Sequence, residues 1–424
     1  MPDDATDDAP TTDDGVVILV GSGQRAYREY LLAGAARRRP IWILDAVDPT
    51  WQKEYVIGST TVELLDRERL VPDQEGLLSA AEAVAAEHRV VGVFSYDETL
   101  VVTTALIAER LGLPGLTARG ADNCRNKHNT RRLLTAAGLP QPHFAYVTDA
   151  DQALAAADSF GYPVVLKPRG MGASIGVIRV DGPEGVRPAF EVADAAGHGG
   201  NSDYEGGALV EECVIGPEIS IDGVVFDGGY TPLFLAHKEV GLEPYFEETG
   251  HVVSATDPLL ADEELLGILR DAHRELGVGY GITHTEVKLT SRGPVIIEVN
   301  ARLGGDLIPY LGSLATGIEP GEVAAEVATG TRPEWTPAKA RTVGIRFLYP
   351  HQNGTVRSVD VPAAPDTPGL LEANVMVRPG TTLLLPPDGY LSRYANVICA
   401  GEDRPGCEEN LAKAAALTTI VLDS

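Results

Sequence analysis

One short stretch of the chain, THTEVKLTSRGPVIIEVNARLGGD starting at residue 283, places carboxylate and amide side chains in a pattern that suits metal binding. It reads as two alternating segments, 283–290 and 294–300, joined by a loop that ends in Gly293, as in three-residue β-hairpin loops. With residue 290 opposite residue 294, Glu286 lies opposite Glu298. Like charges that face each other across two strands destabilise a sheet, so this pairing calls for an explanation.

A bound metal ion is one explanation. Side chains two residues apart share a strand face, so Asn300 lies beside Glu298, whereas Ile297 and Val299 are expected to point into a core. Carboxylate and amide oxygens suit a hard cation such as Mg²⁺, which shares its ligands with substrate phosphates. The alternative is a solvent-facing strand pair that tolerates the repulsion. Three features favour the metal. They are the neutral oxygen of Asn300, Arg302 two positions later, and the pair Gly304-Gly305, which leaves backbone amides unobstructed.

A second group of residues suits phosphate binding. Lys167 ends the apolar segment YPVVLKP, and the glycine-rich GMGASIG at 170–176 follows it with Ser174 inside. Small residues let backbone N–H groups approach an anion, and a lysine acts as a point charge. The chain has no G-x-x-x-x-G-K-[ST] motif, so this is not a P-loop. An ordinary flexible turn is the competing interpretation.

A third motif favours a different cofactor. GSGQRA at 21–26 follows the apolar run VVILV, and Asp45 ends the next apolar run, which matches the dinucleotide fingerprint of a Rossmann domain. An NAD-dependent oxidoreductase therefore stands as an alternative. The other account is that any parallel α/β unit needs glycine at its first turn.

The elements that position these residues fall into three regions. Apolar runs at 16–20, 41–45 and 90–94 alternate with helix-like stretches, which predicts an N-terminal parallel α/β domain at 15–118. Region 119–332 contains the lysines, the glycine-rich loop and the hairpin. Region 333–424 has an α+β texture, with an Asn353-Gly354 hairpin signal and an expected final helix at 409–423.

Composition excludes several partners. The 424-residue chain has a net charge of −27 and a pI near 4.6, which argues against nucleic acid or an anionic membrane as a partner. Its four cysteines lack C-x-x-C spacing, as in a reduced cytoplasmic protein. No apolar run is long enough to span a membrane, and residues 1–14 form an acidic segment expected to be a disordered tail.

Taken in order, Lys127, VVLKP, GMGASIG, LVEECVIGPE, TEVKLT and E-V-N-A-R at 298–302 resemble the ATP-grasp superfamily. The resemblance covers about residues 15–330 and implies an ATP-grasp fold, with a Rossmann-like N-terminal domain and a β-rich C-terminal closing domain. Within the superfamily, ETGHVVSA and ARLGGDLIP are similar to the L-amino-acid ligases, which join amino acids into dipeptides.

The resemblance also implies roles for individual residues. Lys127 and Lys167 would contact the phosphates of ATP, and the loop at 170–176, which includes Ser174, would form a lid over them. The adenine would bind at a hinge formed by Glu211, Glu212 and Val214, and the ribose would bind to Glu218. Two Mg²⁺ ions, with Mn²⁺ as the alternative, would be held by Glu286, Glu298 and Asn300. Arg302 would stabilise the acyl-phosphate. His251 and Lys238 lie where this branch contacts substrate, as do Gly304 and Gly305.

The implied reaction is an ADP-forming ligation of a carboxylate and an amine, both small molecules and expected to be amino acids. Related enzymes are often homodimers. A biotin-carboxylase-like or glycinamide-ribonucleotide-type ligase with another acceptor is the alternative within the fold. A nucleotide-binding module without catalysis is a further alternative, against which the intact E-x-N-x-R pattern argues.

Overall fold

The computed structural model describes residues 15–66, 71–198, 204, 206–364 and 367–423. The predicted acidic tail at 1–14 lies outside these residues, as does most of HGGNSDYEGG at 198–207, whose polar, glycine-rich composition predicts a loop. Within the described ranges, no helix is long and apolar enough to cross a membrane.

The N-terminal part forms a parallel four-stranded sheet with strand order β3-β2-β1-β4. Its strands are β1 (Val16–Val20), β2 (Ile41–Asp45), β3 (Gly58–Thr61) and β4 (Val90–Phe94), and its helices are α1 (Arg25–Arg38), α2 (Gln74–Glu87) and α3 (Val101–Leu111). All of β1 is buried, since a central parallel strand is covered on both faces. The predicted parallel α/β arrangement is confirmed.

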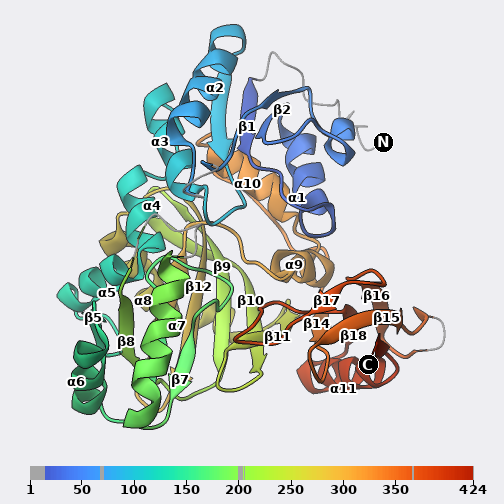
Figure 1. The fold of residues 1–424 in the computed structure, drawn as a ribbon. Helices are drawn as coiled ribbons and strands as arrows, with labels where there is room; N and C mark the ends of the chain where they lie inside the picture. Colours follow the sequence, from blue (N-terminus) through green and yellow to red (C-terminus); the bar gives the residue numbers. More distant parts are fainter. Residues whose placement is uncertain (1–14, 67–70, 199–203, 205, 365–366, 424) are drawn as a thin grey trace.

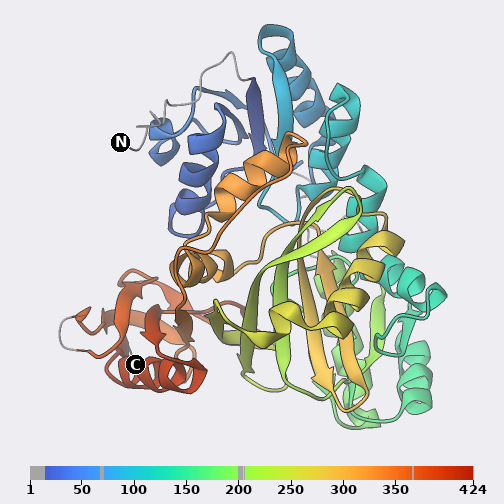
Figure 2. The same cartoon turned by 180° about the vertical axis from the view of Figure 1, so that it is seen from behind.

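A helix from far along the chain completes this N-terminal unit. α10 (Pro320–Ala328) packs against α1 and β4 (Figures 1 and 2). The two helix backbones touch, because a Cβ on Gly321 would lie 2.0 Å from the carbonyl oxygen of Leu31. Ion pairs from Arg37 to Glu319 and Glu322 reinforce the contact at 2.9 and 2.8 Å. The N-terminal sheet is therefore fixed against the rest of the molecule.

The middle of the chain begins with two helices and a small sheet. α4 (Ala118–Arg125) and α5 (Lys127–Ala136) lead into an antiparallel four-stranded sheet of order β5-β8-β6-β7. Its strands are β5 (Phe144–Val147), β6 (Val164–Lys167), β7 (Ile178–Val180) and β8 (Ala208–Glu212), and α6 (Ala150–Phe160) and α7 (Val186–His198) pack on it. The glycine-rich loop connects β6 to β7.

The largest sheet has eight antiparallel strands in the order β13-β12-β9-β10-β11-β14-β18-β16. Its strands are β9 (Glu218–Phe226), β10 (Gly229–Gly241), β11 (Glu247–Ser254), β12 (Gly281–Thr290), β13 (Gly293–Asn300), β14 (Thr342–Leu348), β16 (Leu370–Val375) and β18 (Ala395–Gly401). α8 (Glu263–Leu276) and α9 (Ile308–Thr316) cover parts of it. The hairpin that carries the glutamates thus lies at one edge of the sheet.

The C-terminal region differs from two of our predictions. β14 and β15 (Gly354–Asp360) do not form the hairpin expected around Asn353-Gly354, because β14 pairs with β11 and β18, whereas β15 pairs with β17 (Thr382–Leu383) and β19 (Thr419–Asp423). The expected last helix stops early: α11 (Arg404–Ala416) is followed by strand β19. The β-branched residues of TTIVLD explain that strand.

Candidate active site

The β12–β13 hairpin places Glu286 opposite Glu298, as predicted, but by a different register. Thr290 pairs with Gly293 rather than with residue 294, so the loop has two residues. A bulge then restores the predicted pairing: Val287 pairs with Ile296, and Ile297 is the additional residue. A bulge turns successive side chains toward one face. Ile297 therefore lines the cleft with Glu298 and Asn300 instead of entering the core, where Ile296 is fully buried.

Two lysines compensate the opposed glutamates. Lys238 Nζ lies 2.9 Å from Glu286 Oε1, and Lys127 Nζ lies 3.0 Å from Glu298 Oε1. Burial raises the pKa of Glu286. For Glu298 burial acts in the same direction, but Lys127 and Lys167 outweigh it and lower the pKa. The repulsion that motivated the metal hypothesis is thus partly relieved by the chain itself.

The oxygen atoms on this face suit a divalent cation. Glu286, Glu298 and Asn300 lie along one side of the cleft, and all three offer hard oxygen ligands of the kind that Mg²⁺ and Mn²⁺ accept. With the Asn300 amide oriented to satisfy its neighbours, its nitrogen lies 3.0 Å from Glu298 Oε1 and 3.2 Å from Glu98 Oε2. Rotation of that amide would present its oxygen instead.

Lys167 and Glu211 form a buried ion pair at one wall. Lys167 Nζ is 2.8 Å from Glu211 Oε2, and Arg131 Nε is 2.7 Å from Glu211 Oε1. Burial lowers the pKa of Lys167. Burial raises the pKa of Glu211, but Arg131 and Lys167 outweigh it and bring that pKa to about 2. The carboxylate predicted for the adenine hinge is therefore directed at two cations.

The other predicted hinge residues and the lid line the same cleft. Val214 is buried there, and Glu212 is half-buried and paired with Arg292 at 2.8 Å. In the glycine-rich loop, Ala173 and Ser174 have positive φ values of 55° and 56°, a region that non-glycine residues seldom adopt. Lys127 Nζ donates to the Met171 carbonyl oxygen at 2.7 Å, so one lysine ties the loop to the hairpin.

Lys238 is the centre of a second charge cluster. Its buried Nζ lies 2.9 Å from Glu218, 3.0 Å from Glu248 and 2.9 Å from Glu286. Burial alone would lower its pKa, but the three carboxylates raise it well above the usual value. Lys288 also contacts Glu218, at 3.2 Å. The predicted ribose ligand and a predicted metal ligand therefore share one cation.

His251 lies behind the cleft rather than in it. Its Nε2 is 3.1 Å from Glu248 and 3.6 Å from Asp306, and its side chain has no exposed surface. Burial lowers the pKa of His251, but Asp306 and Glu248 outweigh it and raise the pKa. Both carboxylates line the cleft. In this geometry, any influence of His251 on a substrate would pass through these two carboxylates.

A C-terminal arginine reaches the same place. Arg393 Nη1 and Nη2 donate to the two carboxylate oxygens of Asp306 at 2.7 and 2.6 Å, and its guanidinium lies 3.8 Å from the ring centroid of Phe347. Glu248, Asp306 and Arg393 were not predicted as site residues. Glu248 and Asp306 fall inside the stretches ETGHVVSA and ARLGGDLIP that carried the resemblance, which was the available signal; Arg393 had none.

The loop after β13 holds Arg302 and corrects one prediction. Arg302 lines the cleft, as does Gly305. The Gly304 amide is not available to a ligand, because it donates to the buried carboxylate of Asp222 at 2.7 Å. Asp222 also lies 3.2 Å from His284 Nδ1, and a Cβ on Gly304 would lie 2.7 Å from that nitrogen. Gly304 thus serves packing.

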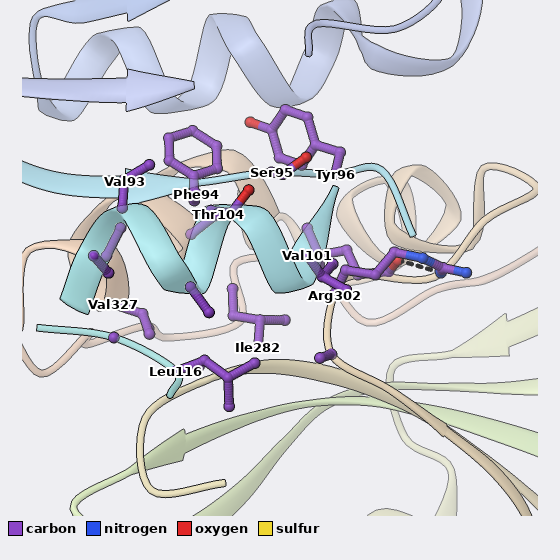
Figure 3. A pocket seen from close by; sticks show the side chains of 18 residues that line it. Val93, Phe94, Ser95, Tyr96, Val101, Thr104, Leu116, Ile282, Arg302 and Val327 are labelled. Atoms are coloured by element: carbon purple, nitrogen blue, oxygen red, sulfur yellow. Dashed lines mark hydrogen bonds between the residues drawn. The ribbon is translucent and has the colours of Figure 1, made fainter. Parts of the chain in front are cut away.

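The cleft joins these residues in one space. It lies between the small and the large sheet and is open to solvent, with about 1310 Å³ of space between its walls, open solvent included. A second, mostly apolar pocket lies between the N-terminal unit and the start of β12. Figure 3 shows Arg302 at its border, with Thr104 of α3 near Ser95 and Ile282 on the other side of that helix. Arg302 borders both spaces.

The residues of the dinucleotide motif form hydrogen bonds with one another at the edge of the N-terminal sheet. Both the backbone nitrogen and the hydroxyl of Ser22 donate to Asp45 Oδ2, and Gln52 donates to the same hydroxyl at 2.7 Å. The carboxylate that a ribose would need is therefore engaged with the first turn. This arrangement favours the structural account of GSGQRA.

Three family models match the chain. They are the ATP-grasp N-terminal domain at residues 63–115, the ATP-grasp domain at 160–310 and the L-amino acid ligase C-terminal domain 2 at 346–423. Among curated proteins, an uncharacterized protein of Sinorhizobium fredii is 28% identical over 412 residues, which cover 94% of this chain and 81% of that protein.

Two further matches carry names. The alanine–anticapsin ligase of Bacillus subtilis is 29% identical over 261 residues, which cover 56% of this chain and 53% of that protein; the match thus spans about half of the ligase. The crystal structure of L-amino acid ligase from Bacillus licheniformis has a TM-score of 0.77 at 22% identity, covering 96% of this chain and 99% of that chain. At this identity the likeness shows a shared fold.

The chain belongs to the ATP-grasp superfamily, as its fold and its matched domains show. Within that superfamily it is similar in its C-terminal domain and in its fold to the L-amino acid ligases, and part of it is similar to a ligase, the alanine–anticapsin ligase. ATP-grasp enzymes use ATP with Mg²⁺ or Mn²⁺.

Proposed function

We propose that this protein activates the carboxylate of an amino acid as an acyl-phosphate, with release of ADP, and couples it to the amine of a second amino acid. The observation that carries the proposal is the convergence, in one cleft, of an oxygen-rich metal face, two lysines under a glycine-rich loop, and Arg302. The named relative, an alanine–anticapsin ligase, supports amino-acid-like substrates.

The nucleotide and two metal ions, when bound, supply the phosphoryl group and neutralise part of its charge. Glu286, Glu298 and Asn300 are the residues that would hold the ions. Lys127 and Lys167 would contact phosphate oxygens. These lysines already balance carboxylates at 3.0 and 2.8 Å, so they are held in place before the nucleotide arrives.

The remaining residues act on the substrate. A carboxylate repels an approaching amine lone pair, whereas a mixed anhydride has a good leaving group. Arg302 would stabilise the charge that develops on the acyl-phosphate. The loop at 170–176 would cover the cleft and exclude water, which would otherwise hydrolyse the anhydride. The hinge and ribose roles of Glu212, Val214 and Glu218 belong to the same proposal.

The test is a screen for ADP release with pairs of amino acids and small carboxylates, followed by mass spectrometry of the positive reactions. Glu298→Gln is expected to lower Mg²⁺-dependent ADP release at least about 100-fold, in line with the loss of charge stabilisation at a reacting group. Glu275→Gln, an exposed glutamate of α8, is the matched control and should behave as wild type. A folded Glu298→Gln variant with wild-type turnover would exclude the proposal.

The alternatives separate in the same assay. ADP release that requires bicarbonate would indicate a biotin-carboxylase-like enzyme, and ADP release only with a phosphoribosylamine would indicate the glycinamide-ribonucleotide type. Tight NADH binding without ATP binding would favour the oxidoreductase. ATP binding without ADP release from any substrate pair would leave a nucleotide-binding module.

A further inference from the structure

Glu98 belongs to the N-terminal unit, yet its carboxylate lies at the catalytic edge of the large sheet. It follows β4 in a loop whose Ser95 hydroxyl donates to the Val20 carbonyl oxygen at 2.7 Å. Glu98 Oε2 lies 2.8 Å from Arg302 Nε and 3.2 Å from the Asn300 amide nitrogen. A residue about 200 positions earlier in the chain thus contacts both a predicted metal ligand and the predicted acyl-phosphate ligand.

The second oxygen of Glu98 is the informative one. Its nearest ion-pair partner is the buried Arg125, whose Nη1 lies 3.8 Å from Oε1, a distance beyond hydrogen bonding. The Glu98 side chain keeps 17% of its surface exposed. By contrast, Asp306 is held at both oxygens by Arg393. Glu98 is therefore anchored on one side and still able to accept a hydrogen bond from a ligand.

Arg302 also keeps capacity for a ligand. Its Nε faces Glu98, and its Nη1 donates to the Leu303 carbonyl oxygen at 2.7 Å, as the dashed line in Figure 3 marks. A guanidinium has five N–H groups, more than these contacts use. A substrate carboxylate on Arg302 would lie within a few ångströms of the Glu98 carboxylate. Two adjacent carboxylates repel, unless the substrate also carries a positive group.

We propose that Glu98 binds the α-ammonium group of the amino acid whose carboxylate is activated, while Arg302 binds that carboxylate. This inference rests on the proposed function and names the substrate class of the same site. The site selects zwitterionic α-amino acids and disfavours carboxylates of the same shape that lack the amino group. The N-terminal unit therefore contributes directly to substrate choice.

The experiment compares two substrates in four proteins. The substrates are the amino acid with the highest wild-type ADP release and its des-amino analogue, for example propionate if alanine is the hit. The proteins are wild type, Glu98→Gln, Glu98→Asp and the control Glu82→Gln, which alters an exposed glutamate of α2 that pairs with Arg110 at 2.9 Å.

We expect wild type and Glu82→Gln to prefer the amino acid by about 100-fold or more in kcat/KM, since a site that bonds a polar group rejects analogues lacking it. Glu98→Gln should raise KM for the amino acid at least about 10-fold, leave KM for ATP unchanged and leave kcat/KM for the analogue undiminished. Glu98→Asp, which keeps the charge, should recover part of the preference.

Two outcomes overturn the inference. If Glu98→Gln lowers activity on both substrates by the same factor, Glu98 only positions Arg302. If the variant keeps the wild-type preference, Glu98 does not contact the ammonium group. In both cases the wild-type reaction still stands, whereas a wild type that releases no ADP with any amino acid contradicts the proposed function itself. Circular dichroism of each variant confirms that the fold is retained.

Discussion

Lys238 offers a direct test of how the cleft is stabilised. Its buried Nζ lies 2.9, 3.0 and 2.9 Å from three carboxylates. At an effective dielectric constant of about 20, each contact is worth about 6 kcal/mol of attraction before desolvation. Desolvation of all four groups and repulsion among the carboxylates offset most of this. We expect Lys238→Met to lower the free energy of unfolding by about 3–5 kcal/mol, as when one partner of a buried ion pair is removed.

The pH dependence gives the sign of the effect. Burial raises the pKa values of Glu218 and Glu248, but Lys238 outweighs it and lowers both. A carboxylate with a lowered folded-state pKa contributes stability above its unfolded pKa, and that contribution disappears as the pH falls through the folded value. Glu286, whose pKa burial raises, acts in the opposite sense and reduces the total. The difference between wild type and Lys238→Met should be largest near neutral pH and shrink below pH 4, roughly the unfolded-state value.

Urea unfolding followed by tryptophan fluorescence and circular dichroism, at neutral and acidic pH, measures this difference. The control is Lys413→Met, because Lys413 pairs with Glu409 at 2.6 Å on the surface and surface pairs contribute little. If both variants lose the same free energy of unfolding at neutral pH, the buried cluster around Lys238 does not stabilise the fold more than a surface ion pair does.

Two further predictions concern the neighbouring residues. Gly304→Ala should lower the free energy of unfolding by about 1–3 kcal/mol, because the new Cβ would lie 2.7 Å from His284. Gly305→Ala has open space around its Cβ and should be as stable as wild type. Equal melting temperatures of the two variants would contradict this prediction. The pKa of His251 is raised, since its two acidic neighbours outweigh burial, so its contribution is present below its unfolded pKa and is lost as the pH rises through the folded value. We expect His251→Asn to cost about 2 kcal/mol near pH 6 and less near pH 9, and a pH-independent difference in urea unfolding would refute the assignment.

The features predicted from sequence were those that depend on nearby residues. The opposed glutamates, the strand before the glycine-rich loop and the parallel N-terminal sheet follow from alternation, apolar runs and glycine positions. The hairpin register shows the limit of such local signals. The loop was expected to have three residues, but the sheet accommodates a bulge at Ile297, and Arg131 donates to the carbonyl oxygen of that residue at 2.6 Å. Nothing in the hairpin's own sequence specifies that partner.

Long-range partners escaped prediction for a related reason. The carboxylates around Lys238 come from three different strands, and Glu98 comes from the loop after β4 of the N-terminal sheet, so no spacing in the chain reveals them. Asn353-Gly354 shows the reverse case, a strong local signal that tertiary pairing overrides. There Asn353 Oδ1 accepts a hydrogen bond from the Leu385 nitrogen at 2.7 Å, and the flanking strands enter different sheets.

The continuous hydrogen bonding from β11 to β14 has a consequence for protein engineering. A cut after residue 332 would remove β14, β18 and β16 from one side of the large sheet and leave the edge of β11 that pairs with β14 without a neighbour. An unpaired edge strand of this kind favours strand pairing between molecules. An exchange of the C-terminal part between related enzymes would therefore require that the incoming strand in place of β14 match β11 residue by residue. The C-terminal part is thus not an independent module.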